Sequence, residues 1–205
     1  LKEYCIYLFP QLSQQNGLID KIDDDFYEKR QIGENDAFIC GIIRKDLIEE
    51  FITYVKKNDI PIDSKITPSI YETHVFLINN NQTTLIEYSA FFGSIQIFRY
   101  LYKNGAKMEP RIWLYGVHSD DAEIISVLEE KNVPIPTYNN SYDSDALLLE
   151  SIKCHHNDMA KYIMNNYKYN ELNLIHFCFE YYNFTFFPNK INPKYILCNV
   201  RLRLF

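Results

Sequence analysis

The sequence contains no long apolar segment. Its apolar runs each extend over only a few of the 205 residues, whereas a helix needs roughly 20 apolar residues to cross a bilayer. Glycine is also scarce, with 6 residues, and neither common glycine-rich phosphate loop is present. The first absence excludes a typical membrane-spanning helix, and the second argues against the usual nucleotide-binding enzymes.

Basic residues are fewer than acidic residues in this sequence. The 21 Lys and Arg residues stand against 27 Asp and Glu residues, so the formal net charge is −6. Proteins bind nucleic acids and anionic membranes largely through clustered positive charge. We therefore expect neither nucleic acid nor a membrane surface among the partners of this chain.

Cysteine occurs five times, and no two cysteines are separated by two residues. The five are Cys5, Cys40, Cys154, Cys178 and Cys198. An odd count without closely spaced pairs argues against a disulfide framework and against a zinc ribbon. Reduced, mostly buried thiols are the simpler interpretation, and they predict an intracellular, cytoplasmic protein.

Hydrophobic residues are abundant, at 47% of the chain, and 16% of the residues are aromatic. This composition provides ample material for a packed core. Residues 84–106, "TLIEYSAFFGSIQIFRYLYKNGA", read as two short helices that are separated by Gly93 and closed by a second glycine. The spacing of Ile97, Phe98 and Leu101 predicts that the second helix is amphipathic.

The segment that begins at Gly93 has three counterparts. They are "DLIEEFITYVKKN" from Asp46, "DDAEIISVLEEKN" from Asp120 and "HHNDMAKYIMNNY" from His155. Each start is a residue type that tolerates a positive φ better than most, and the thirteenth residue is Asn, Gly or Asn in the first three segments. The starts are 47, 27 and 35 residues apart, which is typical of a stacked helical repeat.

The repeated unit resembles the ankyrin repeat, whose pattern combines Thr-Pro-Leu-His, two small residues, a glycine turn, an apolar helix and Gly-Ala. The matching positions are Thr84, Ile86, Ser89, Ala90, Gly93, Ile97, Phe98, Leu101, Gly105 and Ala106. The longer segment "PSIYETHVFLINNNQTTLIEYSAFFGSIQIFRYLYKNGA" looks like the divergent ankyrin-type domain DUF3447. The resemblance implies an all-α, ankyrin-like helical-repeat solenoid with short or missing β-hairpins.

The sequence departs from the ankyrin pattern at two positions, where Leu85 and Glu87 replace Pro and His. Thr84-x-x-Glu87 has the spacing of a capping box, so it can satisfy the amides at the helix start in another way. The same spacing occurs at Ser69-x-x-Glu72 and at Asp46-x-x-Glu49.

We expect a repeat array over residues 36–183, an N-terminal helical cap over residues 1–35 and an irregular tail over residues 184–205. The insertion between the first two units, residues 59–82, should contain a short helix near residues 68–78. The expected units lie near residues 36–58, 84–106, 111–133 and 146–167, with a partial unit at 173–183.

The densest group of chemically active residues is Cys154-His155-His156-Asn157-Asp158. Adjacent residues seldom converge on one metal ion without ligands from elsewhere in the chain. A nucleophilic cysteine needs a base in hydrogen-bond reach and a third group that orients it, and neighbours in sequence rarely provide this geometry. We therefore predict a non-enzymatic protein with no metal site and no cofactor.

The ankyrin resemblance implies a protein-interaction module that uses a concave surface, which the two residues before each turn tend to face. These residues include Arg44, Lys45, Phe91, Phe92, His118, Ser119 and Lys153. An aromatic pair flanked by basic residues suits an acidic partner segment with an apolar anchor. Two alternatives stay open. Phe91 and Phe92 could pack against neighbouring helices, or the chain could be a structural or relic fragment of a larger repeat protein without an independent partner.

Overall fold

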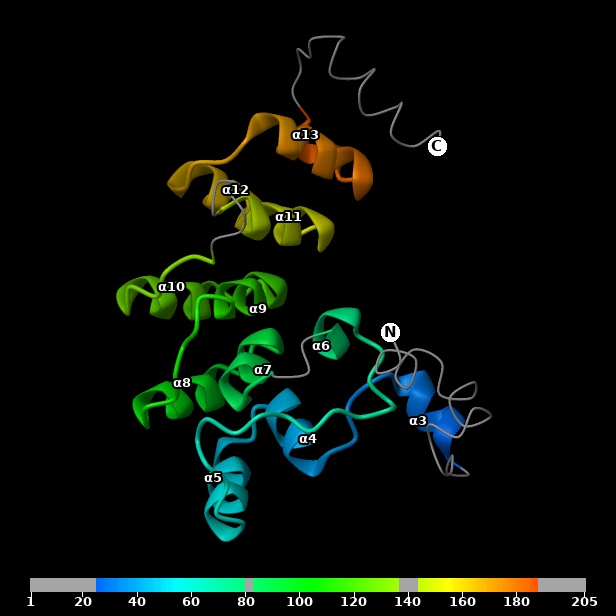
Figure 1. Ribbon diagram of the computed structural model, residues 1–205, viewed down its shortest axis with the longest axis vertical. Coiled ribbons are helices and arrows are strands. Elements are labelled where there is room, and N and C mark those ends of the chain that lie inside the picture. The colour runs from blue at the N-terminus through cyan, green and yellow to red at the C-terminus, as the bar shows by residue number, and fades with distance from the viewer. Residues whose placement is uncertain (1–24, 80–82, 137–143, 188–205) are drawn as a thin grey trace. The chain divides into compact units, whose positions relative to one another are not determined.

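The computed structural model describes residues 25–79, 83–136 and 144–187 (Figure 1). Regular structure in these residues is helical, and the only strand-like feature among them is an isolated antiparallel bridge between Lys65 and Thr84. The helices are α3 (Phe26–Ile32), α4 (Phe38–Arg44), α5 (Ile48–Lys57), α6 (Val75–Asn79), α7 (Leu85–Phe91), α8 (Ile95–Lys103), α9 (Ile112–Ser119), α10 (Ala122–Glu130), α11 (Asp145–Lys153), α12 (Asn157–Asn166), α13 (Glu171–Glu180) and the 3-10 helix η1 (Phe184–Phe186). The predicted all-α class is confirmed for this part of the chain.

The chain divides into two compact units, residues 1–108 and residues 109–205. In the first unit, the helical hairpins α4–α5 and α7–α8 lie side by side, with α4 against α7 and α5 against α8 (Figure 1). In the second unit, α9 pairs with α10, α11 with α12 and α13 with η1, while α11 lies between α9 and α13. Within each unit, the first helices of neighbouring hairpins therefore pack against each other, and in the first unit the second helices do so as well.

The apolar faces predicted from the sequence form the core of each unit. Ile97, Phe98 and Leu101 of α8 are buried, as are Ile124 and Leu128 of α10. Burial of such side chains contributes about 1.5–3 kcal/mol each, whereas helices of this length are marginal in isolation. Packing between hairpins thus stabilises the helices more than their intrinsic propensity does. Among the described residues, no helix combines the length and the apolar character needed to cross a bilayer.

The predicted turns have the expected backbone conformation. Asp46, Gly93, Asp120 and His155 have φ values of 50°, 66°, 56° and 59°. Tyr182, which follows α13, has the same left-handed conformation, with φ 55°. We call these five residues the turn residues. Each one allows the chain to reverse between the two helices of a hairpin.

The ends of the hairpins agree with the sequence pattern less well. Gly105 and Asn132 are left-handed as expected, with φ values of 91° and 52°. The prediction for Asn58 is wrong by one residue, because Asn58 has φ −106° and the left-handed residue is Asp59. Tyr167 is extended, with φ −128°, so the fourth hairpin ends without a left-handed turn.

One hydrogen bond between hairpins recurs in the structure. The donor is the side chain of the residue that directly follows a turn residue. The acceptor is a backbone carbonyl in the preceding hairpin, and it belongs to the residue three positions before the turn residue of that preceding hairpin. The three instances are Ser94 Oγ to Ile43 O at 2.6 Å, His156 Nδ1 to Val117 O at 3.1 Å, and Asn183 Nδ2 to Ile152 O at 3.1 Å. The first lies in one unit and the other two lie in the other. Both units therefore stack their hairpins in the same way.

The predicted helix caps are partly confirmed. Thr84 and Glu87 form the expected capping box at the start of α7. Asp46-x-x-Glu49 does not cap α5. Instead, the Asp46 carboxylate accepts hydrogen bonds from the amides of Gln96 and Ile97, both at 3.0 Å, and so caps α8 in the next hairpin.

Ser69-x-x-Glu72 is not a helix cap either, because the helix of the insertion begins later, at α6. Ser69 Oγ donates to Asp36 at 2.7 Å, and the Glu72 carboxylate accepts from the amide of His74 at 2.8 Å. Arg30 of α3 also donates to the carbonyl of Glu72 at 2.7 Å. The insertion is therefore held against α3 by polar contacts. The expectations for residues 1–24 and 188–205 lie outside the described residues.

Candidate functional site

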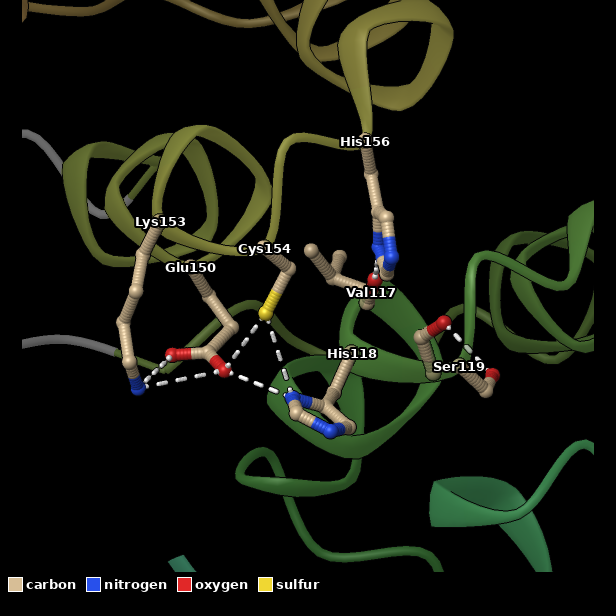
Figure 2. Close-up of polar contacts among 8 residues, drawn as sticks. Val117, His118, Ser119, Glu150, Lys153, Cys154 and His156 are labelled. Carbon is tan, nitrogen blue, oxygen red and sulfur yellow. Dashed lines mark hydrogen bonds and ion pairs between the residues drawn. The ribbon is translucent and has the colours of Figure 1, made fainter. Parts of the chain in front are cut away.

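The second unit gathers three chemically active side chains from two helices (Figure 2). Glu150 lies in α11 and Cys154 caps its C-terminus, so the spacing of four residues places both side chains on one face of the helix. His118 lies in the last turn of α9, which packs against α11. Hairpin stacking therefore brings together residues that are more than 30 positions apart in the sequence.

The distances within this group are short. His118 Nδ1 lies 2.8 Å from Glu150 Oε1, and Cys154 Sγ lies 3.4 Å from each of these two atoms. The ammonium of Lys153 approaches the other carboxylate oxygen, Oε2, at 3.1 Å. Figure 2 shows the thiol, the imidazole and the carboxylate directed toward one another.

The electrostatics of the group favour an ionised carboxylate beside a neutral thiol. Burial raises the pKa of Glu150, but the hydrogen bond from His118 and the charge of Lys153 outweigh it and bring the pKa to about 2. Burial and the adjacent Glu150 carboxylate raise the pKa of the Cys154 thiol to about 12. The thiol therefore stays protonated and donates a hydrogen bond to the carboxylate.

This arrangement differs from a nucleophilic cysteine site. In such a site, one imidazole nitrogen faces the nucleophile and the other faces the group that orients the ring. Here the Cys154 sulfur and the Glu150 oxygen both face Nδ1 of His118. The pKa of the thiol is also raised, whereas a reactive cysteine requires a lowered pKa. The geometry is better suited to hold a ligand common to all three groups than to pass a proton between them.

The first unit contains a counterpart at equivalent positions. Arg44 lies two residues before its turn residue, as His118 does, and it donates to the Tyr88 hydroxyl at 2.9 Å. The Arg44 guanidinium also lies 6.0 Å from the centroid of the Phe92 ring. Tyr88 and Phe92 occupy the positions that Glu150 and Cys154 occupy in their hairpin, five residues and one residue before the turn residue. We call Arg44–Tyr88–Phe92 and His118–Glu150–Cys154 the cross-hairpin clusters.

The remaining residues predicted from the sequence lie in varied environments. Lys45 is exposed, and Ser119 Oγ donates to the carbonyl of Gly116 at 2.9 Å. Phe91 is only 6% exposed, and its ring packs edge-on against His74 and stacks on Phe76. The helix α6 of the insertion supplies Phe76, so Phe91 is a core residue in this structure.

Arg44 is engaged from several sides. Besides Tyr88, its guanidinium pairs with Glu34 at 2.8 Å and donates to the carbonyl of Asn35 at 2.9 Å. Its side chain is 16% exposed. Of the predicted surface residues, the structure therefore joins Arg44 to Phe92 in one unit and links His118 to Lys153 through Glu150 in the other.

Sequence reasoning missed Glu150 and a groove between α10 and α12. The groove has a volume of about 450 Å³ and lies within the second unit. Its lining residues are Asp120, Ala122, Ile125, Ser126, Glu129, Asp158, Met159 and Tyr162. The spacing of Glu150 and Cys154 on one helix was a usable signal for the first omission, but no local pattern indicated the groove.

Comparison with known proteins gives no assignment. No protein-family model matches the chain, and neither a curated protein nor a solved structure matches it.

Proposed function

We propose that the chain is a non-enzymatic protein-interaction module built from ankyrin-like stacked helical hairpins. The hydrogen bond to the preceding hairpin that recurs after three of the five turn residues carries this proposal. Residues Ser94, His156 and Asn183 make this contact in three separate pairs of hairpins. Stacked helical hairpins of this kind present an extended surface that repeat proteins use for binding.

The groove between α10 and α12 is the surface best suited to a partner. Its lining includes the apolar side chains of Ile125 and Met159 and the carboxylates of Asp120 and Asp158. Glu129 adds a third carboxylate, which accepts hydrogen bonds from the hydroxyls of Tyr162 and Tyr167. A lining that combines apolar side chains with carboxylates suits a basic partner segment that carries one apolar anchor.

The surface predicted from the sequence is the second candidate for docking. Lys45 is exposed and Phe92 is half-buried, so both remain accessible to an acidic segment. Arg44 already pairs with Glu34, and Phe91 is covered by its neighbours. For these reasons the groove is favoured over the surface around Phe92.

Selection of peptides from a random display library against the full chain tests the proposal. We expect basic peptides with a single apolar residue to be enriched. Their affinity, measured by fluorescence anisotropy, should fall at least tenfold in the variant Asp120→Lys/Asp158→Lys and stay unchanged in Lys45→Glu. Acidic peptides that respond only to Lys45→Glu would transfer the function to the surface around Phe92.

Failure of both peptide classes would contradict the proposed function. The alternative, a structural or relic fragment of a larger repeat protein, predicts that no peptide binds specifically although the chain is folded.

The three described cysteines, Cys40, Cys154 and Cys178, are free thiols, which fits the proposed location inside a cell, where thiols stay reduced.

A further inference from the structure

The His118–Glu150–Cys154 cluster carries one nitrogen, one oxygen and one sulfur donor. These are the ligand types that Zn²⁺ takes in proteins. Within the described residues, this is the group of His, Cys, Asp and Glu side chains whose ligand atoms all lie within 4.8 Å of one another. It differs from the cluster of adjacent residues in the sequence, because two of its three members come from elsewhere in the chain.

The distances fit a tetrahedral metal ion. Zinc bonds of about 2.3 Å to sulfur and about 2.0–2.1 Å to nitrogen or oxygen place the sulfur about 3.5 Å from the other two ligands. Cys154 Sγ lies 3.4 Å from both His118 Nδ1 and Glu150 Oε1. The nitrogen and oxygen atoms, now 2.8 Å apart as a hydrogen bond, would separate by about 0.5 Å to reach tetrahedral spacing.

We propose that His118, Glu150 and Cys154 bind one Zn²⁺ ion, with solvent as the fourth ligand. Two of the ligands lie one helical turn apart on α11 and the third lies on α9, so the ion would join two neighbouring hairpins. The Lys153 ammonium lies closer to Oε2, at 3.1 Å, than to Oε1, at 3.5 Å, so it holds the carboxylate mainly through the oxygen that faces away from His118 and Cys154. The proposal does not depend on the docking groove.

Access to the cluster is compatible with binding. The His118 side chain is 18% exposed and Cys154 is half-buried, so an ion can enter and a water molecule can complete the coordination. Binding replaces the S–H bond of Cys154 with an S–Zn bond and releases that proton to solvent, with no change in oxidation state.

Neighbouring histidines take no part in the cluster. His156 Nδ1 donates to the carbonyl of Val117 at 3.1 Å, and Figure 2 shows its ring directed away from the thiol. His155 is the turn residue and is exposed. The ligand set is therefore formed by packing between hairpins and not by the adjacent histidines in the sequence.

Titration of the untagged, reduced, metal-free full chain with Co²⁺ tests the site. We expect one equivalent to bind, to produce a thiolate-to-cobalt charge-transfer band, and to be displaced by Zn²⁺. Cys154→Ser should abolish the band. His118→Ala should weaken metal binding by more than about 100-fold, because mutation of a residue that only supports a metal ligand weakens binding by up to about 100-fold. The controls Cys178→Ala and His176→Ala should bind as the wild type does.

Far-UV circular dichroism establishes that each variant is folded, and His118→Gln replaces His118→Ala if the latter unfolds. X-ray absorption of the zinc-loaded chain should show one sulfur ligand at about 2.3 Å and nitrogen or oxygen ligands at about 2.0–2.1 Å. A wild type without the charge-transfer band, or a band that persists in Cys154→Ser, would overturn the proposal.

Discussion

The two cross-hairpin clusters occupy equivalent positions in different units but contain different kinds of side chain. In the first unit, Arg44 donates to the Tyr88 hydroxyl and lies over the ring of Phe92. In the second, the equivalent positions hold an imidazole, a carboxylate and a thiol within hydrogen-bond range. The comparison shows that hairpin stacking determines which positions meet, while the side chains determine whether aromatic packing around one hydrogen bond or a group of ionisable side chains forms there.

The largest expected change in the free energy of unfolding comes from Tyr88 and Glu150, which occupy equivalent positions but stabilise the chain through packing and through electrostatics, respectively. Tyr88 is 1% exposed, so Tyr88→Ala should lower the free energy of unfolding by about 3–5 kcal/mol through the cavity it creates. Glu150→Ala removes hydrogen bonds to a charged group and should cost about 1.5–3 kcal/mol. Urea unfolding measures both values, and a larger loss for Glu150→Ala would contradict the comparison.

The turns offer a second test. Gly93 has φ 66°, and a left-handed conformation costs a residue with a side chain about 1–2 kcal/mol. Gly93→Val should therefore destabilise the chain by about 2 kcal/mol, since Val is also β-branched. In the control Gly41→Ala, the new Cβ would meet only the end of the Arg44 side chain, at 3.9 Å. That variant, within α4, should be more stable by about 0.5–1 kcal/mol in the same denaturant titration.

The recurring hydrogen bond between hairpins can be removed in either unit. Ser94→Ala deletes one buried hydrogen bond and should cost about 1 kcal/mol. Asn183→Ala should cost more, about 2 kcal/mol, because Asn183 also donates to Asn157 and accepts from the amide of Thr185. Thermal unfolding compares the two variants. Equal, negligible losses would mean that this contact does not hold the hairpins together.

The smallest expected effect has the opposite sign. His155 is a left-handed residue with an exposed side chain, whereas Gly93 provides the same turn without a side chain. His155→Gly should relieve backbone strain, which stabilises the folded chain, but glycine also raises the entropy of the unfolded chain, which opposes this gain. The net free energy of unfolding should rise by about 0.5–1 kcal/mol. A destabilised variant would show that His155 has contacts beyond its backbone role.

Local chemistry made part of the fold predictable. Four of the five turn residues, Asp46, Gly93, Asp120 and His155, were identified because few residue types tolerate a positive φ, whereas Tyr182 was not predicted. The buried face of α8 followed from helical spacing. Thr84 and Glu87 lie within one helical turn, so their capping box could be read directly from the sequence.

Features that depend on contacts between hairpins were not predictable. Asp46 caps α8, some 50 residues away, rather than its own hairpin. Phe91 is buried partly because α6 of the insertion lies over it, and no pattern shows where an insertion docks. Glu150 joins His118 only because α9 packs on α11, a register that the sequence of neither helix specifies alone.

The central claim is that the two cross-hairpin clusters are one structural element with different side chains. Transfer of the first cluster into the second unit tests it, through the triple variant His118→Arg/Glu150→Tyr/Cys154→Phe. If the clusters are equivalent, the transferred residues restore one another's contacts. The loss in free energy of unfolding should then be smaller than the sum of the three single losses by at least about 1 kcal/mol. A loss equal to that sum, or larger, would contradict the account.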